Sequence, residues 1–229
     1  ERLSALGEMA AEVAHEIKNP LVSIGGFARR LKDKMNTLSK KREDSDELKS
    51  AANYSEIISN EVERLERLLK NTLIYSKSGA LETEECQINK LIEESLYMFK
   101  SGFFEKNINL VTQFEEDLPL LNLDQQKIKQ VLINLVYNSL ESLSMGGMLK
   151  IQTYLEDYAQ KQKMVTVRVE DTGGGVPQDI FENIFNPFFT TKHSGTGLGL
   201  SICRKIIENH GGSIRGENQI GKGGTVYLH

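Results

Sequence analysis

Apolar residues recur at alternating spacings of three and four along the first 80 residues, and this spacing predicts two long helices. The first series comprises Leu3, Leu6, Ala10, Val13, Ile17, Ile24, Phe27 and Leu31. The second comprises Ala51, Tyr54, Ile58, Val62, Leu65, Leu69, Thr72 and Tyr75. The polar run "TLSKKREDSDEL" between them predicts a loop, and Gly79 predicts a helix end. Residues 1–79 are therefore expected to form an antiparallel helical hairpin.

One hairpin buries only one face of each helix, whereas two hairpins complete a four-helix bundle. We therefore expect a homodimer through residues 1–79. The alternative is a monomeric hairpin that packs on the second half of the chain. The two apolar series extend too far from that half for this to be the first choice.

Residues 80–229 mix helical and strand-like periods without a strict β-α-β rhythm, which favours an α+β domain with a mixed sheet covered by helices on one face. Asp124 is placed to cap a helix over "QQKIKQVLINLVYNSLESL". A later helix, "GLSICRKIIENH", is expected to stop at Gly211 and Gly212, with His210 as a cation at its end. Strands are predicted over "INLVTQF", "PLLNLD", "MLKIQTYLED", "MVTVRVED", "SIRGEN" and "GTVYLH".

The composition of the chain excludes some classes of partner but does not indicate a function. The chain is 39% hydrophobic and 26% charged, with a net charge of −4, so nothing draws it as a whole to nucleic acid or a membrane surface. An anion must instead be held by local groups. Cys86 and Cys203 form no disulfide framework, which favours a reducing compartment, and the apolar helical face around Cys203 favours a core thiol there. No apolar run is long enough to span a bilayer, and we expect a segment of a longer protein.

Two glycine-rich stretches carry unusual chemistry, "DTGGGVP" at 171–177 and "NPFFTTKHSGTGLGLSI" at 186–202. In the second, Gly195, Gly197 and Gly199 run into a helix, so backbone N–H groups converge on a point that suits a phosphate. A dinucleotide fingerprint is disfavoured because no strand precedes "GTGLGL". The run "GENQIGKG" lacks the Ser or Thr and the helix of a P-loop, so a hairpin turn explains it better.

Asn134 and Asn138 are four residues apart and therefore share one helix face. Their amide oxygens suit Mg²⁺ alongside phosphate oxygens and water, although two solvated amides are the simpler alternative. Asp171 either accepts a hydrogen bond from an exocyclic amine or caps the glycine turn. Taken together, the aspartate, the asparagines and the glycines suit a purine, a metal ion and phosphates.

The whole chain resembles the catalytic core of sensor histidine kinases. The resemblance is carried by six motifs in order: "HEIKNPL", "NLVYNS", "DTGGGVP", "NPFFTTK", "GTGLGLSI" and "GGTVYL". It implies a dimerisation and histidine-phosphotransfer hairpin over 1–79, followed by a Bergerat-type ATP-binding domain over 80–229. It also implies a cytoplasmic location, either of the protein itself or of the cytoplasmic part of a membrane-anchored sensor.

The resemblance also implies roles for single residues. Asn134 and Asn138 would hold Mg²⁺ and the phosphates, and Asp171 would contact the adenine amine. The other ATP-binding positions implied are Gly173, Gly175, Phe188, Lys192, Gly195, Thr196, Gly197, Leu198, Gly199 and Thr225. The chain departs from the family at Gly174 and at "NSLES", where "NAxxA" is commoner; neither change removes a ligating group.

His15 falls at an outward heptad position, which excludes a core histidine and leaves a solvated one as the alternative. The resemblance makes it the phosphate acceptor and Glu16 the base. Helix geometry leaves Glu12 open as another base, since Glu12 and Asn19 share the face of His15. The resemblance also implies that Asn19, one turn after His15, orients a water that dephosphorylates the response regulator. Pro20 removes a helical hydrogen bond, so we expect either a hinge or a bend that merely fits the bundle.

The sequence therefore predicts an enzyme that phosphorylates His15 from ATP and Mg²⁺ and passes the phosphoryl group to an aspartate of a response regulator. Two rivals are an ATPase of the same nucleotide fold, such as a chaperone or topoisomerase relative, and a dimerisation scaffold with a degenerate site. The hairpin bearing "HEIKNP" argues against the first, and the intact asparagines and glycines argue against the second.

Overall fold

The computed structural model describes residues 17, 20–35, 45–76, 80–158, 162–192, 195–219 and 223–229. The chain divides into two compact units, the first made of residues 1–77 and 190–198 and the second of residues 78–189 and 199–229. Glu12, His15, Glu16, Asn19 and Gly79 lie outside the described residues, so the predictions made for them stay predictions.

The first unit contains two helices, residues 20–35 and α2 (Ser45–Ser76). The rings of Phe27 and Tyr54, one from each helix, lie 5.8 Å apart, and Pro20 and Ala51 are buried. Helix α2 begins inside the segment predicted as loop. The reason is that Glu, Leu and Lys favour helices even where the apolar spacing is absent.

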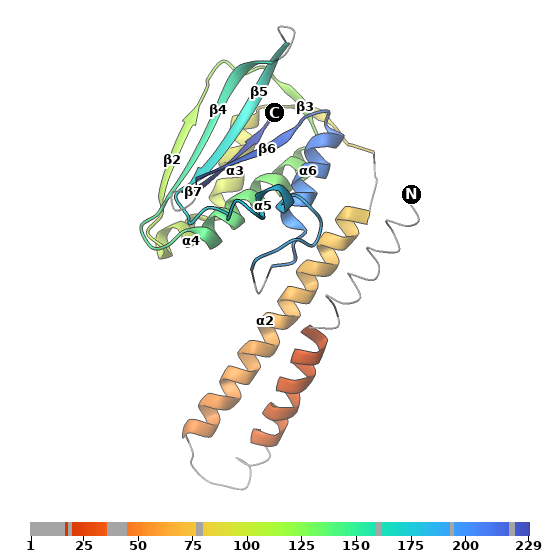
Figure 1. The fold of residues 1–229 in the computed structure, drawn as a ribbon, viewed down its shortest axis with the longest axis vertical. Helices are drawn as coiled ribbons and strands as arrows, with labels where there is room; N and C mark the ends of the chain where they lie inside the picture. The colour runs from red at the N-terminus through yellow and green to blue at the C-terminus, as the bar shows by residue number, and fades with distance from the viewer. Residues whose placement is uncertain are drawn as a thin grey trace. The chain divides into compact units, whose positions relative to one another are not determined.

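The second unit is built on a five-stranded sheet in the order β2-β4-β5-β7-β6. The first pair is parallel and the other three are antiparallel. Helices α3, α5 and α6 cover one face of the sheet (Figure 1), which confirms the predicted α+β class with a mixed sheet. The strands are β2 (Asn109–Phe114), β4 (Met148–Tyr158), β5 (Gln162–Asp171), β6 (Ile214–Gln219) and β7 (Gly223–Leu228), and the helices are α3 (Ile88–Tyr97), α5 (Gln125–Ser142) and α6 (Gly199–Asn209).

The core of this unit follows from strand alternation, which sends every second side chain toward the helices. Leu149 and Ile151 of β4 are fully buried, as are Val131 of α5 and Ile202 of α6. Burying one such side chain contributes about 1.5–3 kcal/mol. The intervening positions on β5, Arg168 and Glu170, are polar and form an ion pair of 3.1 Å.

The start of α5 is fixed by Asp124, whose side chain accepts a hydrogen bond from the Lys127 N–H at 3.1 Å, so the predicted cap is confirmed. The other carboxylate oxygen accepts the N–H of Glu82 at 3.3 Å. The Lys127 ammonium pairs with the same carboxylate and donates to the Ala80 carbonyl at 3.4 Å. Residues 80–82 are thereby attached to the second unit.

His210 corrects one sequence prediction. Helix α6 does end before Gly211, whose φ of +79° suits glycine. The His210 ring, however, is not placed as a cation: its Nε2 accepts the Asp124 N–H at 3.0 Å and its Nδ1 lies 2.7 Å from the Ile206 carbonyl. An acceptor at Nε2 and a donor at Nδ1 define the neutral ring.

Three short elements were not predicted: strand β1 (Glu84–Cys86), helix α4 (Lys100–Glu105) and the 3₁₀ turn η2 (Phe181–Asn183). Strand β1 pairs antiparallel with β3 (Leu121–Leu123) in a separate small sheet. Each has too few residues to display a period.

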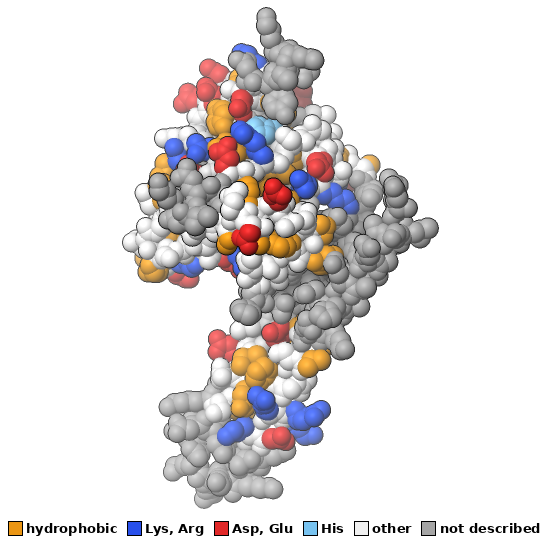
Figure 2. Space-filling model, in the orientation of Figure 1, with side chains coloured by type: hydrophobic (Ala, Val, Ile, Leu, Met, Phe, Trp, Pro, Cys, Tyr) orange, Lys and Arg blue, Asp and Glu red, His pale blue; other side chains and the backbone are white. Residues whose placement is uncertain are grey.

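Charges of both signs are interspersed on the viewed surface of the second unit, as the small net charge leads one to expect (Figure 2). In the part of the chain that the structure describes, no helix has the length and apolarity needed to cross a membrane.

Candidate functional site

Two side-chain amides on α5 lie against the first turn of α6. Asn134 donates from Nδ2 to the Gly199 carbonyl at 3.3 Å, and its amide also bonds the Cys203 thiol. The amide nitrogen of Asn138 lies 3.9 Å from the point where a Cβ on Gly199 would stand. The structure therefore brings together Asn134, Asn138 and Gly199, and leaves the Asn134 amide oxygen as an acceptor.

Asp171 ends strand β5, and its carboxylate is held by three hydrogen bonds. Oδ2 accepts from the Ser139 hydroxyl at 3.0 Å. Oδ1 accepts from the Gly173 N–H at 2.9 Å and from the Ser142 hydroxyl at 3.3 Å. Ser139 directly follows Asn138 on α5, so this carboxylate is fixed against the helix that carries the amide pair.

The glycine loop after β5 approaches α5 closely. A Cβ on Gly173 would lie 2.6 Å from the Ser142 Oγ, closer than any real Cβ approaches an atom, so only glycine fits there. Gly175 has a φ of +69°, a region that glycine adopts without a steric cost. These two glycines therefore have structural reasons to be glycine beside Asp171.

The strand register places the Thr225 side chain on the opposite face of the sheet from that of Asp171, although both residues line one pocket, and a contact of Thr225 with ATP stays a prediction. Thr225 is paired with Glu170 on β5 and with Glu217 on β6. Paired residues share a face, and successive residues alternate, so Thr225 faces away from the helices while the Asp171 side chain contacts α5. The helix-side neighbour on β7 is Gly224, beside which there is open space.

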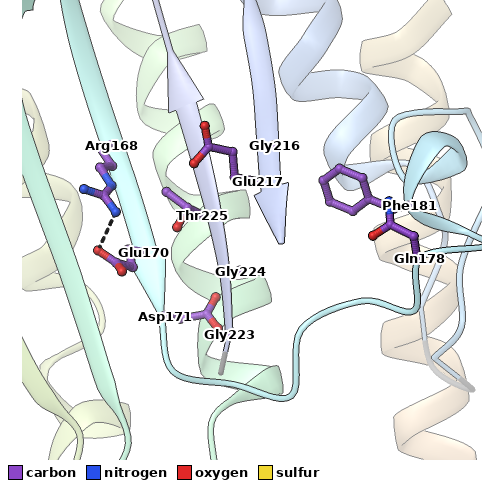
Figure 3. Close-up of a pocket in the computed structure, with 10 residues that line it drawn as sticks. All are labelled: Arg168, Glu170, Asp171, Gln178, Phe181, Gly216, Glu217, Gly223, Gly224 and Thr225. Atoms are coloured by element: carbon purple, nitrogen blue, oxygen red, sulfur yellow. Dashed lines mark ion pairs between the residues drawn. The ribbon is translucent and has the colours of Figure 1, made fainter. Parts of the chain in front are cut away.

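Thr225 lines a polar pocket of about 440 Å³ at the ends of β5, β6 and β7 (Figure 3). Its lining residues are Arg168, Glu170, Asp171, Gln178, Phe181, Gly216, Glu217, Gly223, Gly224 and Thr225. Arg168 and Glu170 are ion-paired there, and Glu217 accepts a 2.8 Å hydrogen bond from the Tyr227 hydroxyl. Arg168 and Glu170 thus pair with each other, whereas Glu217 and Asp171 are bonded to residues outside the pocket lining.

The segment that carries the implied ATP-binding positions from Phe188 onward begins with backbone strain at Phe188, whose φ of +63° is rare for a bulky side chain. The following residues, 190–198, group with the first unit. They include Lys192, Gly195, Thr196, Gly197 and Leu198, for which ligand contacts stay a prediction. Within this segment, the Thr196 hydroxyl accepts the Leu198 N–H at 3.5 Å, and Gly197 has a φ of +65°.

Cys203 is fully buried beside the amide pair. Burial raises the pKa of its thiol to about 12, although the hydrogen bond from Asn134 acts weakly in the opposite direction. Burial likewise raises the pKa of the Cys86 thiol, with the nearby Glu84 carboxylate adding to the effect. Both thiols are therefore neutral core groups, which was predicted from the sequence for Cys203.

Sequence reasoning missed Ser139 and Ser142 as members of the site. The only signal was the "NSLES" run, in which hydroxyls replace the usual small apolar residues one and four positions after Asn138. Residues three apart share a helix face, so the two serines could have been paired with each other. Their common target, Asp171, could not be inferred without the sheet register.

Two family models match the chain. Residues 5–81 match the model "His Kinase A (phospho-acceptor) domain". Residues 123–229 match "Histidine kinase-, DNA gyrase B-, and HSP90-like ATPase".

Curated relatives are similar along the whole chain. Signal transduction histidine-protein kinase AtoS of Escherichia coli (strain K12) is 32% identical over 228 residues, which are 100% of this chain and 35% of AtoS. Sporulation kinase C of Bacillus subtilis (strain 168) is 33% identical over 229 residues, 100% of this chain and 49% of that kinase. The chain thus spans about a third to a half of the length of these relatives.

Solved structures agree. The histidine kinase ThkA, crystallised in complex with the response regulator protein TrrA, is 42% identical with a TM-score of 0.78, covering 100% of this chain and 62% of ThkA. The catalytic domain of ThkA alone is 40% identical with a TM-score of 0.57, covering 65% of this chain and 94% of that domain.

Proposed function

Because this chain belongs to the sensor histidine kinases, we propose that it transfers the γ-phosphoryl group of ATP to His15 and then to an aspartate of a response regulator. The observation that supports this most is the cluster on α5, where the Asn134 and Asn138 amides lie against Gly199 and the next turn holds Asp171. The match of residues 5–81 to a phospho-acceptor domain favours a kinase over an ATPase of the same nucleotide fold.

Within the second unit, we assign the purine to Asp171 and the phosphates to the start of α6. Asp171 is a half-exposed acceptor suited to an exocyclic amine, with Gly173 and Gly175 forming the adjoining loop. Gly199 opens α6, where unpaired backbone N–H groups favour an anion. Lys192 and residues 195–198 are proposed as the phosphate-side lid.

The donor set beside Gly199 fits Mg²⁺. The side-chain amide nitrogen of Asn134 donates to the Gly199 carbonyl and to the Cys203 thiol. Its amide oxygen therefore remains available to bind a hard cation. No group of three or more acidic, histidine or cysteine ligands exists among the described residues, which suits an ion held by amide oxygens, phosphates and water. When bound, Mg²⁺ would neutralise charge on the phosphates; Asn138 and Asn134 would hold and orient it.

We propose that residues 1–79 act as a homodimer. Large apolar side chains remain exposed on both helices of the first unit, visible at the surface in Figure 2. They are Leu21, Val22, Met35, Val62 and Leu69, each at least 41% exposed. Two hairpins packed as a four-helix bundle would bury such residues.

On the hairpin, His15 is proposed as the acceptor and Glu16 as the general base that receives its proton, with Glu12 as the alternative base. Asn19 is proposed to orient a water that dephosphorylates the response regulator. Pro20, which is fully buried, is proposed as a hinge just after the acceptor. If Pro20→Ala left the balance of kinase and phosphatase activity unchanged, the hinge would be excluded.

ThkA was crystallised with a response regulator, and we propose a partner of the same class for this chain. We further propose a cytoplasmic location, where ATP and such a partner meet, as part of a sensor of greater length.

The proposal is tested by incubating the chain with γ-labelled ATP and Mg²⁺. We expect an acid-labile, base-stable label on the protein that His15→Gln abolishes. His15→Gln should still bind ATP, which separates loss of the phosphate acceptor from loss of the nucleotide site. Turnover of ATP without label would favour a plain ATPase, and absence of nucleotide binding would favour a scaffold.

A further inference from the structure

The carboxylate of Asp171 carries two serine hydroxyls from α5 in addition to a backbone N–H. From this geometry we propose that Ser139 and Ser142 are positioning residues that make Asp171 selective for a purine with an exocyclic amine. The inference rests on the proposed function, since it assumes that ATP binds at Asp171. It assigns a role to two residues at which the chain departs from its family.

The hydrogen bonds already made by the Asp171 carboxylate determine what kind of group it can bind next. A carboxylate accepts about four hydrogen bonds, and three are filled by Ser139, Ser142 and Gly173. An ionised carboxylate accepts hydrogen bonds and cannot donate them. An exocyclic amine can satisfy the remaining acceptor position, whereas a ring carbonyl at the same place would face it with a second acceptor.

The two serines also fix the orientation of the Asp171 carboxylate. The hydroxyls hold Oδ1 and Oδ2 from the helix side, so rotation of the carboxylate about χ2 would break at least one bond. Gly173 permits this arrangement, because any Cβ there would collide with the Ser142 Oγ. The remaining acceptor direction of Asp171 is therefore set before a ligand arrives.

The two serines contribute unequally. Ser139 is 4% exposed, and its only bond described is the 3.0 Å bond to Oδ2. The single hydroxyl proton of Ser142 is divided between Asp171 at 3.3 Å and the Ser139 carbonyl at 2.9 Å. Ser139 is accordingly the stronger anchor, and Ser142 assists from the exposed end of the helix.

The experiment measures the affinity of the full chain for two nucleotides by calorimetry: ATP and purine riboside triphosphate, which lacks the amine. We expect Ser139→Ala to weaken ATP binding about tenfold and binding of the amine-free nucleotide less than about twofold, since only ATP has the amine whose hydrogen bond to Asp171 depends on the orientation of that carboxylate. Ser142→Ala should show the same pattern at about threefold.

Ser95→Ala is the matched control, because Ser95 is also a buried helical serine but bonds only the Leu91 carbonyl. It should change neither affinity. Equal weakening of both nucleotides by Ser139→Ala, or no weakening of ATP, would overturn the positioning role while leaving the kinase proposal intact. If the unaltered chain bound neither nucleotide, both proposals would fail. Ser142 is exposed, so its variant keeps the test valid if Ser139→Ala does not fold.

Discussion

His210 accepts a hydrogen bond at Nε2 from the backbone N–H of Asp124, which joins the end of α6 to the start of α5. The two residues are 86 positions apart in the chain. The other ring nitrogen contacts the Ile206 carbonyl of α6 itself, which holds the imidazole in place for its bond to Asp124.

Replacing His210 with Ala should destabilise the second unit by about 1–3 kcal/mol, because the buried Asp124 N–H loses its acceptor. Asn209→Ala, an exposed neighbour, should change stability by less than about 0.5 kcal/mol. Hydrogen exchange of the Asp124 amide provides the specific measurement: it should be accelerated in the first variant only. Unchanged exchange would exclude the proposed link.

Asp124 should make the second unit acid-sensitive. Burial opposes ionisation of this carboxyl, yet the N–H groups of Lys127 and Glu82 and the Lys127 ammonium together hold its pKa below the ordinary value of 3.8. A lowered pKa means that the stabilisation is present above pH 3.8 and is lost as the pH falls through the folded-state pKa. Asp124→Asn should therefore flatten the acid limb of a melting-temperature profile; an unchanged limb would count against this carboxylate.

Cys203 should be chemically inert in the folded protein. Its thiol has a pKa of about 12 against an ordinary value of 9.0, so it is protonated at pH 8. In a Cys86→Ser background, modification by a thiol reagent should follow unfolding, whereas rapid labelling of native protein would refute burial. Because the pKa is raised, this thiol stabilises the fold fully below pH 9 and progressively less toward pH 12, a slope that Cys203→Ala should lack.

The register of β7 makes a direct prediction about nucleotide binding. Thr225→Ala should change ATP affinity less than about twofold, because Thr225 faces Glu170 and Glu217 on the open face. Asp171→Asn should weaken ATP binding at least about tenfold, since an acceptor oxygen is replaced by an amide NH₂ group, which is a donor. Calorimetry measures the ATP affinity of both variants. A large loss of affinity in Thr225→Ala alone would show that the two faces of β7 are exchanged when nucleotide binds.

The Mg²⁺ assignment predicts a split between two conditions. Asn138→Ala should weaken ATP binding about tenfold with Mg²⁺ present and much less when the metal is chelated, because the amide acts through the ion. Asn122→Ala, an exposed amide on β3, is the control and should behave like the unaltered chain. An equal loss of ATP affinity with Mg²⁺ present and with the metal chelated would show that Asn138 contacts the phosphates directly.

Local rules predicted the parts of this fold that depend on neighbouring residues. The Asp124 cap, the stop before Gly211 and the alternating strands all follow from a few adjacent positions. The faces of residues at strand ends do not, because a shift of one residue in pairing reverses them. The face of the sheet on which Thr225 lies could therefore not be predicted from the sequence.

The missed contacts have a similar cause. Ser139 and Asp171 are 32 positions apart, and their meeting depends on how α5 packs against β5. His210 was assigned a charge from its place at a helix end, where a dipole argument is sound in isolation. Its actual role is set by Asp124 on another helix.

The hydrogen bonds of residues 80–82 with Asp124 and Lys127 extend the second unit to positions before its first strand, β1. The Glu82 N–H is one of the donors to the buried Asp124 carboxylate, and the Ala80 carbonyl accepts from the Lys127 ammonium. A separately produced second unit that began at Glu84 would therefore lack partners of the residues that fix the start of α5. A start at or before Ala80 would keep that cap complete.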